Sequence, residues 1–94
     1  MRYIDVAWSH NDANDPVRLV SELDENAYEV RKMEFFRNGV VGHAADGRSV
    51  NGTKLGEAPL PSLAEINLDT QFSGVEIEAR TFELLWQQYV AGEI

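Results

Sequence analysis

The chain begins with a regular alternation of apolar and polar residues. From Arg2 to Trp8, the apolar residues Ile4, Val6 and Trp8 fall on every second position. A period of two is typical of a strand with one buried face. A loop rich in Asn and Asp follows, and alternation returns over residues 17–23. The first quarter of the chain therefore predicts two strands joined by a loop.

The next hairpin has the strongest local signal. Residues 28–37 and 40–45 flank Asn38-Gly39, a pair that accepts the positive φ angles of a two-residue type I′ turn. With that turn, Glu34 faces His43 and Arg31 faces Asp46. Both are pairs of opposite charge across the ladder, which favours this register.

Two features interrupt the regular strands. The apolar phase changes between residues 28–30 and 33–35, which predicts a bulge near Arg31-Lys32. Residues 46–56 are polar and contain three glycines. They predict a mobile loop that ends in a short edge strand.

Helical signals appear in the second half of the chain. Ser62 and Glu65 have capping-box spacing, which predicts a short helix with Leu63 and Ile66 facing inward. Residues 75–78 alternate as a last strand. A second helix is indicated by an apolar stripe at helical spacing, which is more often core than binding surface; its members are Phe82, Leu85, Trp86, Tyr89 and Val90.

The order of elements predicts the fold class. Hairpin-linked strands followed by helices indicate an α+β domain, with an antiparallel sheet of about five strands and two helices packed on one face, in the order β-β-β-β-α-β-α. Residues 1–94 are expected to form a single domain. The other sheet face is expected to be open and polar, with Asp5, Glu29 and Arg31 on it.

The charge of the chain is unevenly distributed. The formal net charge is -8, and residues 55–94 contain seven acidic residues and one basic residue, whereas residues 1–54 contain nine and seven. A field of one sign on part of a small domain repels nucleic acid and anionic membranes and attracts basic proteins. We therefore expect a basic protein partner, and binding to neither nucleic acid nor membrane.

Composition narrows the setting further. The chain has no cysteine, so disulfides and thiolate metal sites are excluded. No apolar run has the length of a signal peptide or membrane span. We expect a cytoplasmic protein.

Three groups of side chains have residue types that suit a chemical site. His10 and the Asp and Asn residues after it are of types that can ligate a metal, but their spacing matches no known metal motif. Turn formation explains the presence of these residues in the loop. Glu34 and His43 resemble a general-base pair, yet no nucleophile accompanies them and a salt pair explains them. Glu76 and Glu78 project to one strand face, where solvation is the simpler explanation. We expect no catalytic residue, metal or cofactor.

Several segments together resemble a family of small bacterial proteins with an uncharacterised domain. The segments are MRYIDVAW with His10 after it, PVRLVSELD, YEVRKMEFFRNG, TKLGEAPLP, EIN and VEIEARTFELLW. The resemblance spans nearly the full chain and implies a single-domain cytoplasmic protein with no established activity. It implies no functional residue.

Two functional hypotheses follow. The first is an acidic protein-binding domain, most concretely an immunity-type inhibitor of a basic toxin or nuclease. The alternative is a regulatory or ligand-sensing domain. The competing explanation of the charge is that acidity only maintains solubility. For the first hypothesis, the acids lack compensating bases and Phe72 is the apolar anchor; the expected partner-binding residues are Glu65, Asp69, Phe72, Glu76, Glu78 and Glu83.

Overall fold

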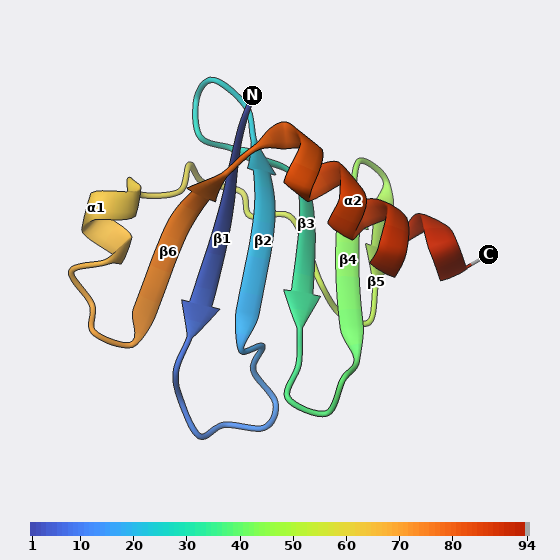
Figure 1. Ribbon diagram of the computed structural model, residues 1–94, viewed down its shortest axis with the longest axis horizontal. Coiled ribbons are helices and arrows are strands. Elements are labelled where there is room, and N and C mark those ends of the chain that lie inside the picture. The colour runs from blue at the N-terminus through green and yellow to red at the C-terminus, as the bar shows by residue number, and fades with distance from the viewer. Residues whose placement is uncertain (94) are drawn as a thin grey trace.

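The computed structural model describes residues 1–93 and contains a six-stranded antiparallel sheet (Figure 1). Along the sheet the strands lie in the order β5-β4-β3-β2-β1-β6. Helix α2 crosses the front of the sheet in Figure 1, and helix α1 lies beside β6. The elements are β1 (Arg2–Trp8), β2 (Arg18–Leu23), β3 (Glu29–Phe35), β4 (Val41–Ala45), β5 (Arg48–Val50), α1 (Leu63–Ile66), β6 (Phe72–Ile77), α2 (Ala79–Tyr89) and the 3₁₀ turn η1 (Ala91–Glu93).

The pleat of the strands separates two cores. Tyr3 on β1 belongs to one hydrophobic cluster, whereas its neighbour Ile4 belongs to another. Successive side chains of a strand point to opposite faces, so the two clusters lie on opposite sides of the sheet. We call the side that holds Tyr3, Val20 and Met33 the helix face, and the side that holds Ile4, Val6 and Leu23 the strap face.

The helix face is closed by α2. Phe82 is 0% exposed and packs with Val20 and Met33 of the sheet. Its ring lies 5.2 Å from that of Tyr3 and is stacked 5.9 Å from Trp86. The predicted apolar stripe therefore forms a core, because helical spacing brings its side chains to one side of α2.

Arg31 fastens α2 to the sheet. Its guanidinium lies over the rings of Phe82 and Trp86, at 4.8 and 5.0 Å. It also donates hydrogen bonds to Glu22 of β2 and to both carboxylate oxygens of Glu83 on α2. The hydrogen bonds to Glu83, followed by the hydrogen bond to Glu22, hold the pKa of Arg31 above its ordinary value. The hydrogen bonds from Arg31 in turn lower the pKa of Glu83.

The strap face is covered by a crossing segment. The connection from β5 to α1 runs behind the sheet in Figure 1, from one edge to the other. We call residues 53–61 the strap. Leu60 of the strap and Leu63 and Ile66 of α1 pack against Ile4, Val6 and Leu23. Ser62 caps α1 as expected, with its Oγ accepting from the Glu65 backbone N–H at 3.2 Å. The second half of the capping box is different, because the Glu65 carboxylate accepts from the Ser62 hydroxyl rather than from its backbone N–H.

The outer edge of β6 carries a side-chain cap. The Asn67 carboxamide donates to the Gly74 carbonyl oxygen at 2.9 Å and accepts from the Gly74 N–H at 2.6 Å. A side chain added at Gly74 would lie 2.9 Å from Leu63. The glycine therefore permits the close approach of α1 to this edge.

The hairpin register differs from the predicted one by one residue. Phe35 pairs with Val41, so Glu34 lies opposite Gly42 and Met33 lies opposite His43. The Gly39 N–H donates to the Phe36 carbonyl and Gly39 has a φ of 89°, which are features of a three-residue loop rather than a two-residue turn. The predicted pairs Glu34 with His43 and Arg31 with Asp46 are therefore wrong.

The expected class is confirmed, and its details change. The fold is α+β, with six strands rather than about five, because residues 48–50 form the edge strand β5. The two helices lie on opposite faces rather than sharing one, since α1 joins the cluster of Ile4 and α2 joins that of Tyr3. The open polar face was also a wrong expectation: Asp5 and Arg31 lie on the helix face, and Glu29 is buried under the strap.

Within residues 1–93, no helix has the length and apolarity to cross a membrane.

Candidate functional site

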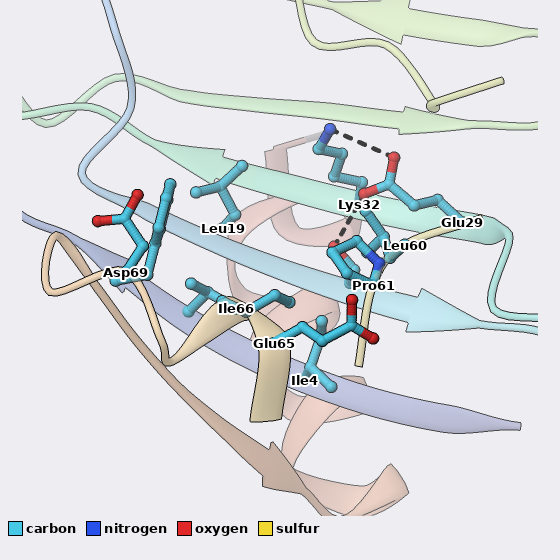
Figure 2. A pocket seen from close by; sticks show the side chains of 12 residues that line it. Ile4, Leu19, Glu29, Lys32, Leu60, Pro61, Glu65, Ile66 and Asp69 are labelled. Carbon is cyan, nitrogen blue, oxygen red and sulfur yellow. Dashed lines mark hydrogen bonds and ion pairs between the residues drawn. The ribbon is translucent and has the colours of Figure 1, made fainter. Parts of the chain in front are cut away.

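A pocket of about 350 Å³ lies on the strap face, between the sheet, the strap and α1 (Figure 2). Most of its wall is apolar. The strands contribute Ile4, Val6, Leu19 and Phe72, and the strap and α1 contribute Leu60, Pro61 and Ile66. Pockets that bind ligands have this character, with apolar walls and a few polar groups.

Glu29 and Lys32 form the polar end of the pocket (Figure 2). Glu29 is only 8% exposed, and its carboxylate accepts hydrogen bonds from Ser21 Oγ at 3.2 Å and from Lys32 Nζ at 3.3 Å. A third donor is the Gly56 backbone N–H, at 2.7 Å. The buried charge is therefore paired and hydrogen-bonded, as burial requires.

The same polar end ties the strap to β3. Lys32 Nζ donates to the Lys54 carbonyl at 3.3 Å and lies 3.8 Å from a Glu34 carboxylate oxygen. Glu34 in turn accepts from Thr53 Oγ1 at 2.7 Å, and Thr53 is fully buried. Three neighbouring side chains of β3 thus form a latch on the strap; we call Glu29, Lys32 and Glu34 the latch.

A bulge in β3 makes this latch. Glu22 pairs with Arg31 and Leu23 pairs with Glu29, so Val30 has no partner in the ladder. Without the extra residue, Glu29 and Lys32 would point to opposite faces, because they are three positions apart. The predicted bulge is present, one residue before the expected position.

Two acids stand at the rim of the pocket. Glu65 and Asp69 both line it and both are exposed, and Figure 2 shows Asp69 at the opposite end from Glu29 and Lys32. Glu65 accepts from Ser62 Oγ at 3.2 Å, and Asp69 accepts from the Gln71 N–H at 2.9 Å. Among the described side chains, no base forms an ion pair with either acid.

Phe72 has a different place from the one expected. It is the first residue of β6 rather than part of a break between helix and strand, and it is half-buried. Its ring stacks on Trp8 at 5.4 Å and contributes to the cluster on the strap face. Phe72 therefore forms part of the core and one wall of the pocket, and it is not a protruding anchor.

The remaining expected residues lie away from the pocket. Glu76 is exposed on the edge strand β6, and Glu78 is exposed at the start of α2. Glu83 lies on the helix face and forms a bidentate pair with Arg31, so the expectation that it lacks a compensating base is wrong. Three of the six expected residues meet at one site, and three do not.

The two histidines have separate surroundings. The His10 ring joins Asp12 N–H and the Pro16 carbonyl, at 3.0 and 2.7 Å, which supports the turn-forming interpretation of its loop. His43 is buried against Trp86 on the helix face, whereas Glu34 points to the strap, so they form no acid-base pair. No group of three potential metal-ligating side chains was found within residues 1–93.

The polar end of the pocket was not predicted from the sequence. The signal available was two charged residues, Glu29 and Lys32, on opposite sides of a predicted phase change. A bulge between them places both side chains on one face of the sheet, where their opposite charges can form a buried ion pair. Ser21 and the strap contacts have no signal in the local sequence, because they join segments far apart in the chain.

No curated protein and no solved structure matches the chain. One family model matches residues 2–91, which is nearly all of the chain, and this confirms the resemblance to an uncharacterised domain family without an established activity. The protein therefore belongs to the family described as Domain of unknown function (DUF6881).

Proposed function

We propose that the protein is a small acidic binding domain that docks a basic protein on its strap face. One observation carries the proposal: the apolar pocket has Phe72 in its wall and the unpaired acids Glu65 and Asp69 on its rim. An apolar hollow next to charges of one sign offers both contact area and electrostatic complementarity to a basic partner.

The net charge of -8 also favours a basic protein as the partner. A field of this sign steers basic proteins toward the domain and repels nucleic acid and anionic membranes, which are not among the proposed partners. A standard interface of roughly 800 Å² per partner would cover about 13% of the accessible surface of 5942 Å². The most concrete form of the proposal is an immunity-type inhibitor that covers a basic toxin or nuclease in the cytoplasm.

Catalysis is left out of the proposal. In the pocket, the carboxylate of Glu29 and the ammonium of Lys32 are bonded to each other and to the strap. A general acid or base must exchange a proton with a substrate within hydrogen-bonding distance. Glu29 and Lys32 are poorly placed for that role, because their hydrogen bonds are already made to each other and to the strap.

The test compares two double variants with equal changes in charge. Glu65→Lys/Asp69→Lys alters the rim, and Glu25→Lys/Asp46→Lys alters exposed acids in turns outside the pocket. Partners captured by the wild-type protein are purified, and association rates are measured over a salt series. We expect the rim variant to slow association by about tenfold more than the control at low salt, because nearby charges steer best. Equal slowing by both variants contradicts docking at the pocket.

The alternative function is a regulatory or ligand-sensing domain. The pocket volume of about 350 Å³ favours it, because small-molecule sites start at roughly 300 Å³. A metabolite that raises the melting temperature of the wild type, and of the Glu65→Lys/Asp69→Lys variant equally, would support this alternative over protein docking.

A further inference from the structure

We propose that the partner places one large apolar side chain in the pocket, with Lys or Arg residues beside it, and that Leu68 packs against the partner next to the rim. This inference rests on the proposed function and names the segment that the strap face recognises.

The polar end of the pocket is closed to an entering charged group. Glu29 already accepts three hydrogen bonds, from Ser21, Lys32 and Gly56. Lys32 donates to Glu29 and to the Lys54 carbonyl, with Glu34 close by. A charged or amide tip that entered would lose its water without gaining a free partner, which is costly. The pocket therefore selects an apolar tip.

The walls suit such a tip. Ile4, Val6, Leu19, Ile66 and Phe72 surround the space with aliphatic and aromatic surface. A Leu, Met or Phe side chain that enters exchanges water for these contacts, and burial of its apolar surface favours binding. One side chain of this kind is the anchor that interfaces commonly place in a pocket.

The rim sets the charge of the flanking residues. Glu65 and Asp69 are four positions apart at the end of α1, and the backbone N–H groups of Leu68 and Asp69 bond back to Glu65 and Ile66. Both acids therefore stand on one ordered turn beside the mouth of the pocket. Lys or Arg residues next to the apolar anchor would meet these carboxylates, whereas Asp or Glu residues would be repelled.

Leu68 lies within this ordered turn, directly before Asp69. It is 81% exposed, more than any other large hydrophobic residue described. Its backbone is already fixed by the hydrogen bond to Glu65, so covering its side chain costs little ordering. Leu68 is therefore the exposed apolar residue of this turn, whereas Phe72, the anchor expected from the sequence, forms part of the pocket wall.

The experiment titrates three synthetic peptides into ¹⁵N-labelled protein: Ac-Gly-Lys-Leu-Lys-Gly-NH₂, the same peptide with Ser in place of Leu, and the same peptide with Glu in place of both Lys residues. We expect the first peptide to shift the amides of Ile4, Val6, Leu19 and Ile66 in a saturable way. The Ser and Glu peptides should bind at least about tenfold more weakly, a difference of about 1.4 kcal/mol. Equal binding of all three peptides, or no saturable shift of these amides at millimolar Lys-Leu-Lys peptide, overturns the inference.

Leu68→Ser and its matched control Leu84→Ser test the second contact. Leu84 is 61% exposed on α2, so both changes remove an exposed leucine and should leave the fold intact. With a captured partner, Leu68→Ser should speed dissociation by about tenfold and Leu84→Ser should leave it unchanged. Equal effects overturn the role of Leu68. If rim charge reversal still slows association while the peptides and Leu68→Ser do nothing, the proposed function stands and this inference fails.

Discussion

On the helix face, the rings of Phe82 and Trp86 of α2 pack against aromatic and aliphatic side chains of the sheet. On the strap face, by contrast, the strap is attached to β3 mainly by charged side chains. The helix face has a contiguous aromatic core with Arg31 over it. The strap face leaves a pocket beside its core. An amphipathic helix of three turns fills a sheet face, and a crossing segment with a single helical turn does not.

This difference assigns separate roles to the two faces. Most of the stability of the domain is expected on the helix face, where the fully buried Phe82 lies. The strap face has the lower density of apolar contact and the exposed acids, as surfaces that exchange partners do.

Phe82→Ala should remove the centre of the helix-face core. Phe82 is 0% exposed, and truncating a buried Phe costs about 3–5 kcal/mol, which is most of the stability of a small domain. Phe72→Ala on the strap face should cost about half as much, because Phe72 is only half-buried and adjoins the pocket. Urea denaturation measures both. Similar losses for the two variants would contradict the division between the faces.

Gly42→Ala should push the strap away from the sheet. A β-carbon at Gly42 would clash with Thr53 Oγ1, so Thr53 must move. Overpacking of this kind costs about 1–3 kcal/mol. Thr53→Ala removes the clashing oxygen, and the double variant should therefore be less destabilised than the sum of the two single variants. Strict additivity in denaturation experiments would show that the clash is not the cause.

Glu29→Gln should loosen the strap and leave α2 unaffected. The change removes the carboxylate that pairs with Lys32 and accepts from the Gly56 N–H, at an expected cost of about 1–2 kcal/mol. Hydrogen exchange at Gly56 should become faster, while exchange within α2 should change only with global stability. Glu25→Gln, an exposed turn position, serves as the control. Faster exchange in α2 alone would refute the latch.

Glu83→Gln should have the smallest effect, and the effect should depend on pH. Hydrogen bonds from Arg31 lower the pKa of Glu83 in the folded state below its ordinary 4.5. The contact therefore stabilises the fold above pH 4.5, and this stabilisation disappears as the pH falls through the lower folded pKa. Because Glu83 is exposed, we expect a difference below about 1 kcal/mol at pH 7, and this difference should shrink as the pH falls below 4.5. A difference that grows with acidification would have the wrong sign.

Local signals in the sequence predicted the elements well. The capping box located α1, and the helical stripe located α2 and its buried side. Each signal resides in a few consecutive residues, where backbone geometry determines which side chains share a face. The hairpin register failed by one residue because Asn38-Gly39 suits both a two-residue and a three-residue loop.

Contacts between segments that lie far apart in the chain could not be predicted from the sequence. The residues of the strap show no apolar period. Their partners Glu34 and Glu29 lie 19 and 27 positions earlier in the chain. The apolar period at residues 75–78 also hid the true start of β6 at Phe72, because Gly74 interrupts the pattern. Glu65 and Asp69 were selected for charge alone, and the fold brings them to the pocket.

Asn67 acts as a substitute for a seventh strand. Its carboxamide presents one donor and one acceptor to Gly74, as a backbone peptide group of a neighbouring strand does. A free strand edge is a template on which further chains can add, and sheets that grow in this way aggregate. A strand from a second molecule that approaches β6 must first displace Asn67 and then the turn that carries it. A single amide at the border of the sheet thus works against uncontrolled growth of the sheet into fibres.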